Sequence, residues 1–113
     1  MESKLVAYAL DFTSFLIQKI KEKNEIRQVI LFGSVAREEA RVTSDIDIFI
    51  NVLNENKNLE TEIRKILDNF QSSTKYKNYW KPFGIQNEIN LMIGELEKWR
   101  DLKSSIIANG IVL

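Results

Sequence analysis

The 113-residue sequence contains no cysteine and no histidine, only one proline and four glycines. Without cysteine the chain forms neither a disulfide nor a thiolate metal site, and without histidine it has no imidazole for catalysis or zinc binding. Any acid–base or metal chemistry must therefore use carboxylates, lysine, tyrosine or hydroxyl groups. Sixteen basic residues balance sixteen acidic ones. This zero net charge argues against a partner such as a long nucleic acid, although it leaves room for a local basic patch.

No apolar run approaches the roughly 18–20 residues that a membrane span needs, and we find no pattern typical of a signal peptide. We therefore expect a cytoplasmic protein with no membrane partner. The composition, 44% apolar and 28% charged, is that of a folded globular protein. A chain of 113 residues has room for one hydrophobic core, so we expect a single domain over residues 1–113.

Hydrophobic periodicity predicts a series of helices and strands. Helices are predicted at Ser3–Lys23, Leu59–Gln71 and Glu95–Asn109, a shorter one at Val35–Ala40, strands at Ile26–Phe32, Asp45–Val52, Ile85–Ile93 and the tail Ile111–Leu113, and a long loop at Ser72–Gly84. This order is typical of an α/β or α+β domain with a small mixed sheet. We expect the helices to cover one face of that sheet and to leave the other face open.

The end of the first predicted strand carries Gly33 and Ser34, directly before a predicted helix. Because glycine has no Cβ, the backbone can approach another group closely at this position. The turn would present free backbone N–H groups, a hydroxyl and the positive end of a helix dipole. Together these groups favour an anion such as a phosphate.

Two carboxylates, Asp45 and Asp47, stand two residues apart on the second predicted strand. The period-two alternation of a strand places both on one face and turns Ile46 and Ile48 to the other. Two unit charges ~4 Å apart repel by about 4 kcal/mol at an effective dielectric near 20, and a divalent cation removes that conflict. Oxygen ligands beside a phosphate site indicate Mg²⁺ or Mn²⁺. A phosphate-binding turn together with such a metal site is typical of enzymes that transfer phosphoryl or nucleotidyl groups.

Gly33-Ser34, ten intervening residues and Asp45-Ile46-Asp47 resemble the signature of the DNA polymerase beta nucleotidyltransferase superfamily. The short chain resembles its minimal nucleotidyltransferase (MNT) branch. This resemblance implies the nucleotidyltransferase fold, with Gly33 and Ser34 at the triphosphate of the nucleotide. It also implies that Asp45 and Asp47 act in catalysis and hold the metal. Two neighbours of these motifs, Arg37 and Ser44, are further candidates for nucleotide binding.

The expected reaction moves a nucleoside monophosphate, AMP from ATP or the corresponding group of another NTP, to an acceptor hydroxyl. The resemblance implies a helical HEPN-type protein partner, with the chain acting as the antitoxin of a toxin–antitoxin pair and modifying that partner. The neutral net charge also favours a protein or small-molecule acceptor over an extended nucleic acid. The sequence leaves open whether the chain forms a homo-oligomer and whether the natural protein continues past Leu113.

The sequence departs from the family pattern at two positions. Glu38 follows Ala36-Arg37 where the family commonly has glycine, and Asn90 occupies the place of the third catalytic carboxylate. Glu88, two residues earlier on the same predicted strand face, is our candidate for the missing acid. The alternative is a catalytically degenerate module that binds nucleotide and metal, or a partner only.

The predicted loop is rich in aromatics and lysine, in the run Lys75–Lys81. Such residues either stack a base, bind a partner or anchor the loop on the core, and anchoring is the commonest of the three. A domain that only binds a partner through this loop is therefore a further alternative. Trp99 has helical spacing with Leu96, Leu102 and Ile106, which predicts a core position.

Overall fold

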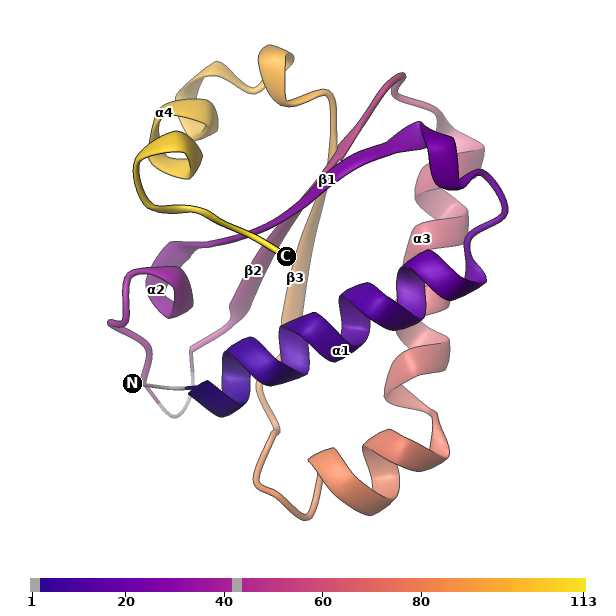
Figure 1. The fold of residues 1–113 in the computed structure, drawn as a ribbon, viewed down its shortest axis with the longest axis vertical. Helices are drawn as coiled ribbons and strands as arrows, with labels where there is room; N and C mark the ends of the chain where they lie inside the picture. Colours follow the sequence, from indigo (N-terminus) through magenta and orange to yellow (C-terminus); the bar gives the residue numbers. More distant parts are fainter. Residues whose placement is uncertain (1–2, 42–43) are drawn as a thin grey trace.

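A computed structural model describes residues 3–41 and 44–113, and its centre is one four-stranded mixed sheet (Figure 1). The strands are β1 (Ile26–Phe32), β2 (Ile46–Val52), β3 (Ile89–Gly94) and β4 (Ile111–Val112), in the order β3-β2-β1-β4. β1 is antiparallel to β2 and β4, whereas β2 and β3 are parallel. The central strands are rich in apolar side chains because much of each is buried on both faces. The predicted α/β class with a small mixed sheet is confirmed.

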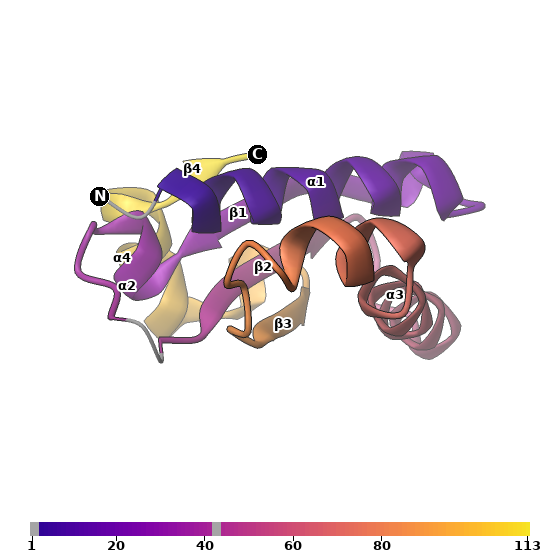
Figure 2. The same ribbon diagram turned by 90° about the horizontal axis from the view of Figure 1, so that it is seen from below.

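Two helices, α1 (Ser3–Lys19) and α3 (Lys57–Gln71), cover one face of the sheet (Figure 2). α3 begins after Asn56, whose side-chain oxygen accepts hydrogen bonds from the backbone N–H groups of Asn58 (2.8 Å) and Leu59 (3.3 Å). Apolar residues at helical spacing face the sheet in both helices. The main core includes Leu5, Tyr8, Phe12, Leu16, Leu31, Ile48, Ile50, Ile63, Phe70 and Leu91.

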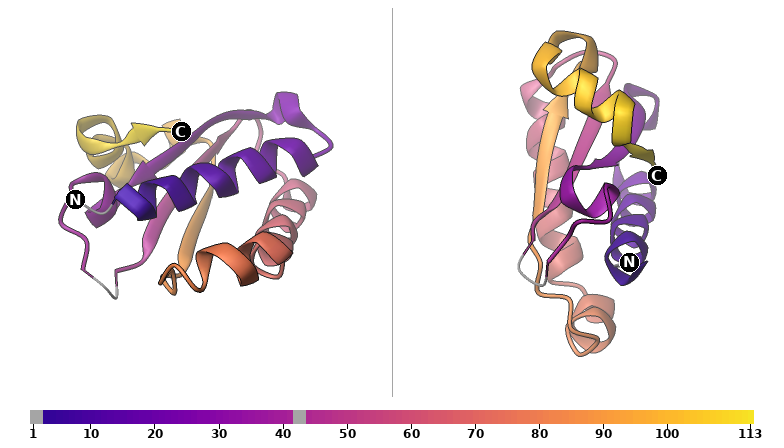
Figure 3. Two further views of the ribbon diagram at one scale, coloured as in Figure 1. Left: turned by 60° about the horizontal axis from the view of Figure 1, so that its bottom comes forward. Right: turned by 90° about the vertical axis from the view of Figure 1, so that its left-hand side faces the viewer.

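The other face of the sheet is only partly open, because α4 (Arg100–Asn109) packs on it (Figure 3). The predicted placement of helices on one face alone is corrected in this respect. The physical reason is strand alternation, which turns large apolar side chains of β1 and β2 onto this second face, where they need cover. The second cluster combines Ile30, Phe32, Phe49, Leu96 and Ile106, with Met92, Trp99 and Leu102 against it. Trp99, predicted to be a core residue, is half-buried and packs against this cluster.

Residues Ser72–Gly84 are largely helical, which corrects the predicted loop. A short helical turn continues into the π-helix η2 (Tyr76–Trp80), in which the N–H of Lys81 donates to the carbonyl of Tyr76 at 2.8 Å. This i to i+5 bond is the defining bond of a π-helix. Trp80 is buried, so the anchoring on the core that the aromatic residues of this run indicate is confirmed for Trp80.

Several element boundaries also differ from the predictions. α1 ends at Lys19, and a separate 3₁₀ turn, η1 (Lys23–Glu25), leads into β1. β3 begins at Ile89 instead of Ile85. The last predicted helix is divided into a 3₁₀ turn, η3 (Leu96–Lys98), and α4. Across the part of the chain that the structure describes, no helix has the length and apolar character needed to cross a membrane.

Candidate active site

The predicted site lies where β1 ends and β2 begins. β1 and β2 are antiparallel and pair Phe32 with Asp47, so the turn after β1 stands beside the Asp47 side chain. Gly33 has a φ of +73°, and a Cβ built there would overlap Asp47 Oδ2 and lie 3.1 Å from its Cγ. Ser34 follows in the same turn. The structure thus brings the Gly33–Ser34 turn against one of the two aspartates, as the motif spacing predicts.

The third polar side chain beside this turn is an amide. β2 and β3 are parallel and place Asn90 opposite Asp47, and Asn90 Nδ2 donates a hydrogen bond of 3.2 Å to Asp47 Oδ1. An amide cannot take up a proton at neutral pH, but its oxygen can ligate a hard cation. Asn90 therefore occupies the place next to Asp47 without supplying a base.

Asp45 directly precedes β2 and is exposed, whereas Ile46 is fully buried, so Asp45 and Asp47 share the open face. Glu88 is also exposed and directly precedes β3, where its carbonyl accepts a hydrogen bond from the N–H of Ile46 at 2.8 Å. Within residues 3–41 and 44–113, no three acidic side chains gather closely enough to hold a metal ion. The structure thus unites Asp45 and Asp47 on one face but does not gather them with Glu88 into a carboxylate trio.

The helix that follows Gly33 is shorter than predicted. α2 (Gly33–Ala36) has four residues and begins after Phe32, and among the described residues no side chain caps it. Its end is a Schellman motif, in which the N–H of Glu39 donates to the carbonyl of Ser34 (2.8 Å) and that of Glu38 to the carbonyl of Val35 (3.2 Å). Such a short helix has a small dipole, so the amides of the turn itself are what the site offers to an anion.

The left-handed position of that motif is occupied by Glu38, which has a φ of +61°. Glycine is the usual residue at this position because a Cβ is strained in the left-handed region. The family's glycine at this place therefore has a conformational reason. Glu38 adopts the same backbone conformation in spite of its side chain.

Arg37 and Ser44 already have partners within the protein. Arg37 Nε forms a surface ion pair of 3.0 Å with Glu39 Oε1. Ser44 is hydrogen-bonded to Arg41, because its Oγ accepts from the N–H of Arg41 (2.8 Å) and its N–H donates to the Arg41 carbonyl (3.0 Å). The Ser44 carbonyl also accepts from Asn87 Nδ2 at 2.7 Å. Nucleotide binding by Arg37 and Ser44 stays a prediction.

Residues 15–113 match the protein family described as "Polymerase beta, Nucleotidyltransferase". The chain belongs to this nucleotidyltransferase family. The match includes the Gly33–Ser34 turn, both aspartates and every strand of the sheet, so the family predicted from the motif is confirmed. The nucleotidyltransferase domain also has a local likeness to a relative from Methanocaldococcus jannaschii, with 53% identity over 32 residues.

That relative is named "Putative protein adenylyltransferase". The matched segment is 28% of this nucleotidyltransferase chain and 33% of the relative, so the match spans about a third of the relative's length. The family membership therefore rests on the match over residues 15–113, and the substrates of the whole protein are a matter of proposal.

The sequence gives no signal for the partner of one anchoring residue of this nucleotidyltransferase domain, the contact of Asp11 with Trp80. Asp11 Oδ2 accepts a hydrogen bond of 2.7 Å from Trp80 Nε1 across 69 residues of sequence. The spacing of Trp80 within a polar, lysine-rich stretch carries no periodic signal. Only the docking of η2 onto α1 reveals it.

Proposed function

We propose that the protein transfers AMP from ATP to a hydroxyl group of a partner protein. The observation that carries this proposal is the contact of Asp47 with Gly33. The Asp47 carboxylate, which we propose binds a metal ion together with Asp45, lies against the turn that we propose binds the triphosphate. The name of the archaeal relative supports both the adenylyl group and the protein acceptor.

The donor set fits Mg²⁺. Asp45, Asp47 and the Asn90 side-chain oxygen are all hard oxygen donors on the open face, and the sequence has no histidine or cysteine that would favour a softer metal. These residues would hold the ion, which neutralises phosphate charge when bound. To ligate through oxygen, the Asn90 amide would give up its hydrogen bond to Asp47 Oδ1 or turn over.

The proposed reaction is a displacement at the α-phosphorus. The acceptor oxygen forms a bond to that phosphorus, the bond to the β-phosphate oxygen breaks, and pyrophosphate leaves. Backbone N–H groups at Gly33 and Ser34 orient the triphosphate for this attack. We propose that the Glu88 carboxylate takes up the proton of the acceptor hydroxyl, because the Asn90 amide cannot accept it. Its exposure leaves the Glu88 side chain free to move toward an incoming hydroxyl.

The partner proposed from the family resemblance is a HEPN-type helical protein, to which this chain would act as a cytoplasmic antitoxin. The domain is small, and α4 covers part of the open face of its sheet, so little surface is left to bind an acceptor. A partner protein that brings the acceptor hydroxyl is consistent with this. It also agrees with the zero net charge of the chain, which disfavours an extended nucleic acid as acceptor.

The first experiment is calorimetric titration of ATP, with and without Mg²⁺, into the wild-type protein and the Asp45→Asn/Asp47→Asn variant. We expect binding that depends on Mg²⁺ and is lost in the variant. Transfer of the α-phosphate label to a co-purified partner then tests catalysis. Mg²⁺-independent binding that is equal in the two proteins would contradict the assigned site.

A second candidate function is supported by Asn90 and by the separation of Glu88 from the aspartates. A module of this kind would bind nucleotide and metal without transferring the nucleotide. Glu88→Gln separates the two functions, because it should abolish label transfer and leave ATP affinity nearly unchanged if Glu88 is the base. Unchanged label transfer in that variant would remove Glu88 from the mechanism. No transfer by the wild type with any partner, despite Mg²⁺-dependent ATP binding, would favour the binding module.

A further inference from the structure

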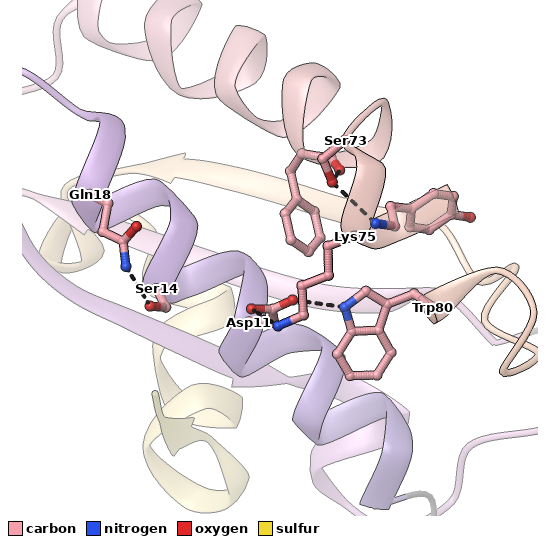
Figure 4. Close-up of polar contacts among 8 residues, drawn as sticks. Asp11, Ser14, Gln18, Ser73, Lys75 and Trp80 are labelled. Atoms are coloured by element: carbon pink, nitrogen blue, oxygen red, sulfur yellow. Dashed lines mark hydrogen bonds and ion pairs between the residues drawn. The ribbon is translucent and has the colours of Figure 1, made fainter. Parts of the chain in front are cut away.

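Residues 74–84 form a firmly anchored projection beside α1 (Figure 4). Both oxygens of Asp11 hold it, since Oδ2 accepts from Trp80 Nε1 at 2.7 Å and Oδ1 pairs with Lys75 Nζ at 3.1 Å. The Tyr76 hydroxyl donates to the carbonyl of Ile85 at 3.2 Å. With Trp80 itself 5% exposed, the backbone of the segment is tied to the rest of the domain at several points.

Two large aromatic side chains of this segment nevertheless face solvent. Tyr79 is 51% exposed and Phe83 is 53% exposed. Their rings are stacked, with centroids 5.7 Å apart and planes at 20°. Exposed aromatic side chains on a rigid support are characteristic of protein interfaces, because little side-chain entropy is lost when a partner covers them.

The segment that carries these rings is positively charged in a chain whose net charge is zero, and its lysines at positions 77 and 81 share a flank of the helical turn next to the flank of the rings. From Ser72 to Asn87 the sequence has three lysines and no acidic residue. Lys75 is paired with Asp11, but Lys77 and Lys81 are exposed and make no ion pair within residues 3–41 and 44–113. We call Tyr79, Phe83, Lys77, Lys81 and the nearby Lys4 the aromatic–lysine platform.

The platform lies close to the candidate active site. The chain runs from Gly84 to Asn87 in three residues, which span at most about 10 Å. Asn87 Nδ2 then donates to the carbonyl of Ser44, and the Glu88 carbonyl accepts from the N–H of Ile46. Asp45 lies between these two contacts. η2 and the beginning of β2 both come forward in the view from below (Figure 2).

We propose that the aromatic–lysine platform docks an acidic surface of the partner protein that carries the acceptor hydroxyl. This inference rests on the proposed function and names the charge of its partner. A partner held there would place a neighbouring hydroxyl within reach of the open face that carries Asp45. Lysines at the rim would steer an acidic surface into place, and the apolar ring edges would be covered on contact.

The arrangement of the rings favours a protein over a single-stranded nucleic acid. A base stacks on the free face of an aromatic ring. Tyr79 already stacks on Phe83, and Lys4 Nζ lies over the Phe83 ring at 6.0 Å from its centroid. Trp80 meets Tyr79 at 86° with centroids 4.8 Å apart. The ring edges and the lysines are what a partner can contact.

The test uses a fluorescein-labelled random copolymer of glutamate and tyrosine, an acidic polypeptide with hydroxyl groups. Its anisotropy is followed as protein is added at low salt (about 10 mM), where charge interactions reach about 30 Å. ATP is left out, so that the result does not depend on transfer. The variant Lys77→Glu/Lys81→Glu is compared with Lys57→Glu/Lys65→Glu, a matched change at two exposed lysines of α3.

We expect the platform variant to bind the copolymer about tenfold more weakly than the wild type, and the control variant to lose less than about threefold. Tyr79→Ala/Phe83→Ala should also weaken binding. Equal losses in the two charge variants, or no binding by the wild type, would overturn the proposal. So would tighter binding of an oligouridylate of similar charge, because it would identify a nucleic-acid surface. Copolymer binding without label transfer would leave the platform in place and count against the proposed catalysis alone.

Discussion

The Asp47 carboxylate lies so close to Gly33 that residue 33 has no room for a side chain. A Cβ at this position would overlap Asp47 Oδ2, and the φ of +73° is itself unfavourable for any residue with a Cβ. The backbone conformation therefore favours glycine here, and any Cβ would force the Asp47 side chain to move. The pairing of Phe32 with Asp47 across β1 and β2 creates this contact.

Gly33→Ala should accordingly displace Asp47 and weaken Mg²⁺-dependent ATP binding by about tenfold or more. Backbone strain and the displaced carboxylate should also lower the free energy of unfolding by about 1–3 kcal/mol. Gly84→Ala is a matched control, because Gly84 has a φ of +96° but its Cβ would meet only Lys4 Nζ, at 3.5 Å. The control should lose stability and keep ATP affinity. Equal loss of affinity in both variants would contradict the role of the Gly33–Asp47 contact.

Asn90→Asp should make the protein more responsive to Mg²⁺. It replaces the amide that donates to Asp47 Oδ1 with a second carboxylate at 3.2 Å, which costs about 1 kcal/mol or more without metal. A bound divalent cation reverses this repulsion, so the rise in Tm on adding Mg²⁺ should be larger than in the wild type. Asn69→Asp, on the exposed side of α3, controls for the added charge. An equal Mg²⁺ response in all three proteins would show that Asn90 does not face the metal site.

Glu38→Gly should stabilise the protein by about 1 kcal/mol. Glycine relieves the strain of the left-handed conformation at φ +61° in the Schellman motif that ends α2. Glu38→Ala removes the same charge but keeps a Cβ, so its free energy of unfolding should stay near that of the wild type. Urea denaturation of the three proteins measures the difference. A gain of equal size in both variants would assign the effect to charge instead of conformation.

The buried hydroxyl of Tyr8 predicts a loss of stability at alkaline pH. Burial raises the Tyr8 pKa to about 12, while the nearby Gln71 side chain acts in the opposite direction. Within the described residues the hydroxyl has no hydrogen bond of normal geometry. Above a pH of about 10 the unfolded tyrosine ionises while the folded one stays protonated, so stability falls by about 2 kcal/mol up to pH 12.

Tyr8→Phe should show a smaller alkaline decline and should be at least as stable as the wild type near pH 7, because it removes an unpaired buried polar atom. Tyr79→Phe, at an exposed position, should keep the wild-type decline. Thermal unfolding monitored between pH 7 and 12 compares the three proteins. A marked loss of stability at pH 7 in Tyr8→Phe would mean that the hydroxyl has a partner.

Short-range patterns predicted much of the fold. The alternation in β2 and the apolar run of β1 identified the central strands, and helical spacing identified α1 and α3 within a few residues. The predicted element boundaries were wrong where contacts between residues far apart in the sequence determine the local structure. Trp80 lies in a stretch whose composition is typical of a loop, yet this stretch is helical and docks on α1. The hydrogen bond of Trp80 to Asp11, 69 residues away in the sequence, is one of the contacts that hold it there. The burial of Phe49 under α4 likewise depends on the side of the sheet on which the chain after β3 packs, which local sequence patterns do not determine.

The sequence by itself determined the nucleotidyltransferase motif and the residue types of the site, because the Gly33-Ser34 turn and the alternation of Asp45 and Asp47 are local properties of the backbone. Only the tertiary structure decided which of these groups meet. Antiparallel pairing placed Asp47 against Gly33, and the parallel register with β3 placed Asn90 beside Asp47 and left Glu88 before the strand. Strand register depends on pairing energies summed over whole strands, and a shift of one residue would turn each of these side chains to the opposite face.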